Sequence, residues 1–93
     1  MYFVTTITKT GDDYRCVGYF KERAEAERVV ANNCADIFEA GMYPYAVIES
    51  IRPGLYQYDQ RPTWYKYDTK SEGYKKTRKP DFIDDHLVGF SIG

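Results

Sequence analysis

The spacing of hydrophobic and polar positions indicates two β-strands at the start of the chain. Residues 2–9 and residues 14–20 are both rich in β-branched and aromatic side chains, a composition typical of strands. Between them, Thr10-Gly11-Asp12-Asp13 has turn chemistry, because Gly accepts a positive φ and Asp caps its own backbone. The two segments therefore predict a hairpin, and Gly18 within the second strand predicts a bulge or a close packing contact.

Residues 22–40 change to the spacing of an α-helix. One face recurs at intervals of three and four residues, and its members are Ala26, Val29, Val30, Asn33, Cys34, Ile37 and Phe38. Glutamates crowd the first turns, where carboxylates complement the helix dipole. Gly41 is placed to end the helix as a C-cap, although Asn32-Asn33 is a point at which the pattern could divide into two shorter helices.

The second half of the chain is predicted to be mainly β-structure. Its strand segments, each rich in β-branched or aromatic residues, are 45–51, 63–68, 74–78 and 87–92. The connections predicted between them are a turn at Pro53-Gly54, an irregular loop over 55–62, a hairpin turn over 70–73 and a helical turn over 81–86.

This order, ββαβββ followed by a short tail, predicts an α+β fold. A mainly antiparallel sheet with one helix packed on one face buries one apolar stripe against one apolar face. The length of 93 residues fits one domain spanning residues 1–93. We expect its core to contain Val4, Val29, Val30, Ile37, Val47 and Ile48.

The aromatic content is high for so small a core. Ten of the 93 residues are Tyr, with five Phe and one Trp. Tyr tolerates a half-exposed position on a sheet, because its body is apolar and its tip is polar. Aromatic side chains are also enriched in interfaces, so the surplus rings predict self-association, with a two-fold dimer as the simplest closed form.

Cysteine usage and hydropathy predict a protein of a reducing, cytosolic setting. Cys16 falls in a predicted strand and Cys34 in the predicted helix, and we interpret both as small buried hydrophobes. Two cysteines alone do not establish a disulfide. Met1 leads directly into a strand pattern rather than a signal peptide. No apolar run reaches the roughly 20 residues of a membrane span, so we expect no membrane partner.

The inventory of reactive side chains argues against an enzyme. The one histidine, His86, follows Asp84-Asp85, and no Cys or His spacing supports a metal site. Glycines stand singly, so there is no phosphate-binding loop. A Cys–His pair, or hydrolysis through Asp81, Asp84 and Asp85, are the alternatives that remain. We expect a non-catalytic protein without metal or cofactor.

The chemically unusual part of the chain is residues 61–80. This segment holds seven Lys or Arg and two Asp or Glu, a net charge of +5, whereas the whole chain carries −1. Rings interleave with these cations, and flat rings stack on a base while cations meet phosphate. The candidate ligand-binding residues are Arg61, Trp64, Tyr65, Tyr67, Tyr74, Lys76 and Arg78. The alternative is a hairpin whose Lys-rich edge prevents edge-to-edge aggregation.

Several segments resemble small proteins of gut Firmicutes and their phages. They are Tyr2-Phe-Val-Thr-Thr-Ile7, Val17-Gly18-Tyr19-Phe20, Tyr45-Ala-Val-Ile-Glu49, Gly54-Leu-Tyr56, Trp64-Tyr-Lys-Tyr67, Lys79-Pro80 and Gly89-Phe-Ser-Ile-Gly93. The resemblance spans nearly the whole chain and implies a phage or prophage origin. It also implies action by binding, either as a counter-defence inhibitor or as a sponge for nucleotide immune signals.

Three binding functions are compatible with these features of the sequence. We expect a non-catalytic protein that sequesters an anionic small molecule, such as a cyclic nucleotide immune signal. The alternative is an inhibitor that binds a host defence protein through a Tyr-rich surface. Nucleic-acid binding is the third, and the acidic flanks and net charge of −1 argue against it.

Overall fold

The computed structural model describes residues 1–52 and 62–83. Some sequence predictions therefore lie outside the described residues. These are the turn at Pro53-Gly54, the loop expected over 55–62 as far as Arg61, the acidic residues Asp84, Asp85 and His86, and the strand expected over 87–92.

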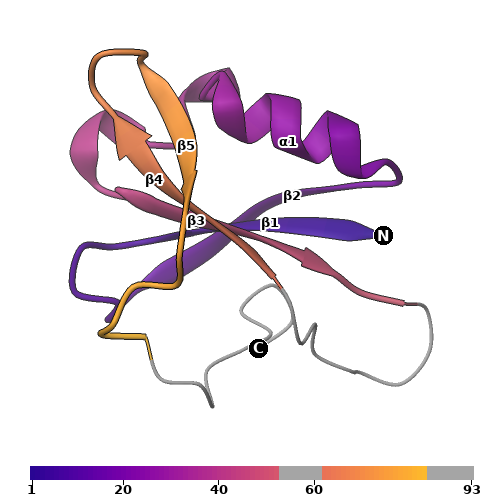
Figure 1. Cartoon of the computed structure of the whole chain (residues 1–93), viewed down its shortest axis with the longest axis horizontal. Helices are drawn as coiled ribbons and strands as arrows, with labels where there is room; N and C mark the ends of the chain where they lie inside the picture. The colour runs from indigo at the N-terminus through magenta and orange to yellow at the C-terminus, as the bar shows by residue number, and fades with distance from the viewer. Residues whose placement is uncertain (53–61, 84–93) are drawn as a thin grey trace.

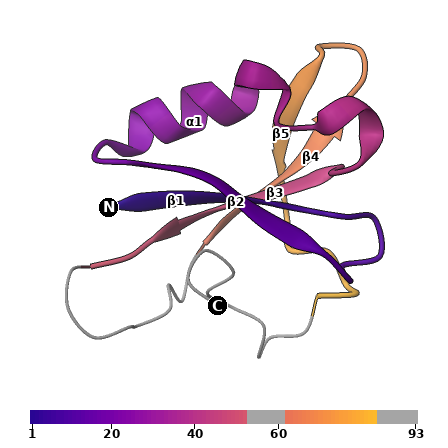
Figure 2. The same ribbon diagram turned by 180° about the vertical axis from the view of Figure 1, so that it is seen from behind.

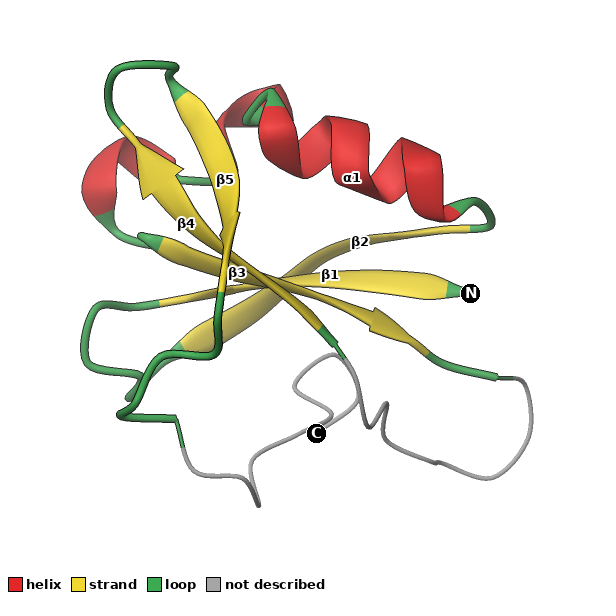
Figure 3. Cartoon of the chain, in the orientation of Figure 1, coloured by secondary structure: helices red, strands yellow, loops and turns green. Residues whose placement is uncertain are grey.

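Five strands form one sheet. They are β1 (Tyr2–Ile7), β2 (Tyr14–Phe20), β3 (Tyr45–Ser50), β4 (Thr63–Asp68) and β5 (Gly73–Thr77). Their order in space is β2-β1-β3-β4-β5, and every neighbouring pair is antiparallel. The two hairpins form the two sides of the sheet, with β3 between them, and the strands fan out with a strong twist (Figure 3).

One α-helix in the described part of the chain, α1 (Arg23–Ala31), carries the chain from β2 towards β3 across one face of the sheet (Figures 1 and 2). The predicted α+β class, the antiparallel sheet and the ββαβββ order are confirmed. The register of β1 on β2 shifts between Val4 and Thr5, because Val4 pairs with Gly18 and Thr5 with Cys16. Val17 is therefore the extra residue of a β-bulge beside Gly18, as the glycine predicts.

The main core lies between α1 and the sheet. Ala26 and Val30 of the helix are fully buried; their partners in this cluster are Val4, Ile37, Ala46, Ile48, Tyr65 and Tyr74. Five of the six residues expected in the core are buried. The sixth, Val29, is only half-buried, since it lies about 100° around the helix from Val30.

The opposite face of the sheet, called the far face below, is also covered. Ile7, Val47 and Trp64 pack there against Ile83, which belongs to the segment after β5. Both faces of the second hairpin are packed at Trp64 and Tyr65, which are buried on opposite sides of β4.

The helix is shorter than residues 22–40, so that expectation is wrong, while the break expected at Asn32-Asn33 is confirmed. α1 ends at Ala31 and is capped by Asn32. Asn33 then has φ 47°, in the left-handed region that a right-handed helix cannot continue through. Two short 3₁₀ turns follow, Cys34–Asp36 and Glu39–Gly41, so Gly41 ends the second of these turns rather than α1.

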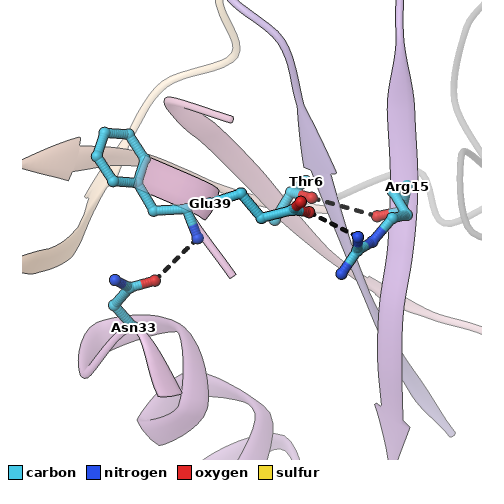
Figure 4. A network of polar contacts seen from close by, with 5 residues as sticks. Thr6, Arg15, Asn33 and Glu39 are labelled. Carbon is cyan, nitrogen blue, oxygen red and sulfur yellow. Dashed lines mark hydrogen bonds and ion pairs between the residues drawn. The ribbon is translucent and has the colours of Figure 1, made fainter. Parts of the chain in front are cut away.

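A polar network holds this left-handed segment in place (Figure 4). The Asn33 side-chain oxygen accepts a hydrogen bond from the backbone N–H of Phe38 at 2.9 Å. Arg15 Nη1 and Glu39 Oε2 form an ion pair at 2.7 Å, although their angle is not that of a hydrogen bond. Left-handed backbone costs an L-residue about 1–2 kcal/mol. The residues concerned are Asn33, Ala35, Asp36, Glu39 and Ala40.

Both cysteines are exposed, which corrects the expectation of two buried hydrophobes. Cys16 lies on the outer strand β2, where it pairs with Thr5 of β1 and no described residue covers its side chain. Cys34 lies in a 3₁₀ turn rather than on the apolar face of a helix.

Gly73 fixes how closely the second hairpin approaches the helix. A Cβ at residue 73 would lie 1.8 Å from the carbonyl oxygen of Ala31, in the last turn of α1. Backbone atoms cannot move aside as a flexible side chain can, so only glycine allows β5 to begin at this distance from the helix.

We therefore expect Gly73→Ala to lower the free energy of unfolding by at least about 1–3 kcal/mol, the usual cost of overpacking. Urea denaturation followed by circular dichroism measures this. Gly18→Ala is the matched control, because its nearest neighbour would be 3.6 Å away, an ordinary contact. Equal losses in the two variants would show that the contact with Ala31 is not the constraint.

Candidate functional site

Strand register places one row of side chains across β3, β4 and β5. Tyr45 pairs with Lys66, and Lys66 pairs with Lys75. Side chains in such a row share a face of the sheet, and their Cα atoms are separated by about 5 Å per strand. A ring and two ammonium groups thus line up on the far face of the sheet.

The segment after β5 returns beneath this face, near the β1–β2 turn (Figures 1 and 2). Its Phe82 ring lies edge-on to Tyr45, with centroids 5.3 Å apart. Gly11 accommodates that ring, because a Cβ at residue 11 would lie 2.9 Å from Phe82. Phe82 remains 44% exposed, so the ring pair is available to solvent.

A hollow of about 400 Å³ opens beside the ring pair, and we call it hollow A. Its lining residues are Tyr45, Lys66, Thr77, Arg78, Lys79, Pro80, Asp81 and Phe82. Lys66 and Arg78 form no ion pair within residues 1–52 and 62–83. Hollow A therefore combines two rings, three cationic side chains and one carboxylate, that of Asp81.

A second hollow of about 440 Å³, hollow B, adjoins the first. It is lined by Lys66, Tyr67, Asp68, Thr69, Lys75, Lys76 and Thr77, so Lys66 and Thr77 belong to both. Lys75 Nζ lies 3.2 Å from Asp68 Oδ2. The hydrogen bond from Ser71, and then that from Lys75, hold the pKa of Asp68 below its usual range. Asp68 thus stays ionised and balances Lys75.

The structure separates the predicted site residues into two groups. Arg61 lies outside the described residues. The rings of Trp64, Tyr65 and Tyr74 are buried in the two cores. Tyr67 stacks on Phe38 with centroids 3.6 Å apart and planes 4° apart. A ligand would have to displace core neighbours to stack on these four rings, and their binding roles stay predictions.

The predicted cations, in contrast, are where a ligand can reach them. Arg78 lines hollow A and Lys76 lines hollow B, and both are exposed. The rings beside these cations are Tyr45 and Phe82, neither of which is among the predicted site residues. Tyr45 could be found from the sequence only through its pairing with Lys66, and that pairing requires knowledge of the β3–β4 register. The position of Phe82 beside Tyr45 depends on how the chain returns after β5.

The buried tyrosines have a structural effect of their own. The Tyr74 hydroxyl donates a hydrogen bond to the carbonyl oxygen of Tyr43, whereas the hydroxyl of Tyr65, which is 3% exposed, has no hydrogen-bond partner among the described residues. Burial, and then the negative charge of Glu27, raises the pKa of Tyr65 to about 12. Burial also raises the pKa of Tyr74, with further contributions led by Tyr67.

Comparison with family models, with curated proteins and with solved structures gave no match. Of the helices in the described parts of the chain, none is long and apolar enough to cross a membrane. Among residues 1–52 and 62–83, no three His, Cys, Asp or Glu side chains are grouped as a metal site. The geometry and charge of hollows A and B are therefore what a functional proposal can rest on.

The raised pKa values of Tyr65 and Tyr74 predict a loss of stability in alkali. Because the unfolded chain ionises these groups near pH 10 and the folded protein does so only at higher pH, stability is complete below pH 10. It then falls as the pH rises towards 12, by up to about 1.4 kcal/mol per pH unit for each tyrosine. Tyr65→Phe should reduce this slope and cost little stability at pH 7, since the lost hydroxyl has no partner in the described parts of the chain.

Urea unfolding at pH 7, 10, 11 and 12 measures the slope. Tyr19→Phe, at an exposed position, is the control and should keep the wild-type slope. An unchanged slope in Tyr65→Phe would contradict the assignment of the effect to buried tyrosine.

Proposed function

We propose that the protein binds an anionic small molecule that carries a flat ring, such as a nucleotide, and does not convert it. One observation carries this proposal: the exposed Tyr45–Phe82 ring pair lies in the same hollow as Lys66 and Arg78, two cations without an ion pair within the described residues. Rings supply stacking for a base, and cations supply the contacts to phosphate.

Each side chain of hollow A has a distinct part in this proposal. The guanidinium of Arg78 suits bidentate contact with a phosphate, whereas Lys66 acts as a mobile point charge. The Thr77 hydroxyl is a further donor to an anion. Asp81 repels phosphate but accepts hydrogen bonds from a base amino group or a sugar hydroxyl, which favours a ligand with such donors over a simple inorganic anion.

Sequestration is the form of activity that we propose for this site. The resemblance to phage proteins suggests a role against host defence, and cyclic nucleotide immune signals have the ring and the negative charge that hollow A suits. A protein that holds such a signal unchanged would act as a sponge, one ligand per site. Its place of action would be the cytosol of the host cell.

We expect Lys66→Gln and Arg78→Gln each to weaken nucleotide binding by about fivefold, the scale of one partly exposed ion contact to phosphate. Isothermal titration with a panel of linear and cyclic nucleotides measures this at fixed ionic strength. Lys70→Gln is the charge-matched control, because Lys70 is exposed but lines neither hollow. The nucleotide should be recovered unchanged after the protein is denatured.

Two results would count against this function. Retention of full affinity in both folded variants would move the ligand away from hollow A. Recovery of a cleaved nucleotide would show that the protein is an enzyme.

A second candidate function, binding to another protein, is favoured by exposed rings on the outer strand β2. Tyr19 is 65% exposed and lies against Phe3, with centroids 5.7 Å apart. Tyr14 at the other end of β2 is also exposed. Strand β2 contains no Lys or Pro, the residues that commonly protect an edge strand, whereas β5 carries Lys75 and Lys76. A second copy of the chain or a host defence protein would suit this edge.

Self-association is the simplest form of this candidate. We expect the wild-type protein to form dimers at high micromolar concentration in sedimentation equilibrium, and Tyr19→Ser to remain monomeric. Met42→Ser, which removes an exposed apolar side chain outside the sheet, is the control and should dimerise as wild type does. A monomeric wild type would remove the homodimer and leave only a different protein as partner.

A further inference from the structure

The two hollows form one continuous surface, because Lys66 and Thr77 line both of them. From this we infer that the ligand has one ring and a chain of at least two phosphate groups. The ring would stack on Tyr45 and Phe82 in hollow A, and the phosphate chain would pass Lys66 into hollow B. This inference rests on the proposed function and specifies the class of ligand: it favours a linear nucleoside polyphosphate over the cyclic nucleotides named above.

The chemistry of hollow B suits phosphate and not a second base. Its ring, Tyr67, is stacked face to face on Phe38 and lies edge-on to Tyr74 with centroids 5.4 Å apart. The other side chains that line hollow B are ammonium groups, hydroxyls and the carboxylate of Asp68. Ammonium and hydroxyl groups donate hydrogen bonds to phosphate oxygens, whereas no described ring in hollow B has a free face for stacking.

The charges along the shared row point the same way. Lys66 and Lys75 are directly opposite each other on β4 and β5, an arrangement in which like charges repel. Asp68 balances Lys75, but Lys66 has no ion pair with the described residues. Lys76 pairs with the core residue Tyr65 and therefore lies on the other face of the sheet. A phosphate chain that crosses the row would place negative charge beside Lys66 and Lys75.

The spacing of the row also fits a chain of phosphates. Lys66 and Lys75 begin about 5 Å apart on neighbouring strands, and the flexible four-carbon stem of lysine lets each ammonium group adjust to the oxygen that it meets. Arg78 lines only hollow A and Lys75 only hollow B. Arg78 is therefore the contact to the phosphate next to the nucleoside, and Lys75 is the contact to the end of the chain.

Adenosine mono-, di- and triphosphate test this assignment, titrated calorimetrically with EDTA present and ionic strength matched. We expect wild-type affinity to rise about fivefold with each added phosphate, the scale of one partly exposed charge contact. Lys75→Gln should lose the gain for the triphosphate and leave the monophosphate unaffected. Arg78→Gln should weaken all three, and Lys70→Gln should bind as wild type does.

Inorganic triphosphate separates the contribution of the ring from that of the chain. It should bind at least tenfold more weakly than the nucleoside triphosphate, since one stacked base contributes roughly 1–3 kcal/mol. Equal affinity would mean that Tyr45 and Phe82 are not used and would overturn the inference.

The inference and the proposed function fail in different ways. If the three nucleotides bind equally and Lys75→Gln changes none of them, the phosphate chain is wrong and hollow A alone holds the ligand. If neither the adenosine series nor the matched guanosine and cyclic nucleotides bind, the proposed function is wrong as well.

Discussion

The arrangement of this molecule depends on how closely its second hairpin packs beneath the end of α1. Gly73 allows β5 to begin against the Ala31 carbonyl, where no side chain fits. The Tyr74 hydroxyl then reaches the Tyr43 carbonyl, and Phe38 stacks on Tyr67. These contacts fix the position of β4 and β5 beside β3. The Tyr45–Lys66–Lys75 row, and hence both hollows, follow from that position.

Most of the fold was predictable because its elements are local. Alternating β-branched and aromatic residues gave the five described strands to within one or two residues, and turn residues gave both hairpins. The length of the helix was not predictable, because the apolar spacing continues past Asn33 to Ile37 and Phe38. Those two side chains do contribute to the core. They reach it from the short segment between the two 3₁₀ turns rather than from a continued helix. Hydrophobic periodicity alone does not distinguish these two backbone conformations.

The candidate site was predictable only in its cations. Lys76 and Arg78 are exposed because charged side chains avoid burial, so local sequence was a sound guide for them. For rings it was not, since a Trp or Tyr serves equally well in a core and on a surface. Trp64 is buried because Ile83 returns from beyond β5 to cover it. Tyr45 and Phe82 stay accessible for the same non-local reason, which no window of sequence contains.

The balance between ring and charge decides what kind of ligand these hollows can retain. The cations of hollow A are partly or fully exposed, and exposed ion contacts contribute about 0.2–1 kcal/mol each and weaken with salt. Stacking on an exposed ring pair contributes more and does not depend on salt. The rings would therefore supply most of the affinity of a single-phosphate ligand. Several phosphates, held together along the path from Arg78 past Lys66 to Lys75, would add contacts without a further loss of translational freedom. The cationic row thus acts mainly on ligands that carry their charges in one chain, which makes it a determinant of specificity more than of basal affinity.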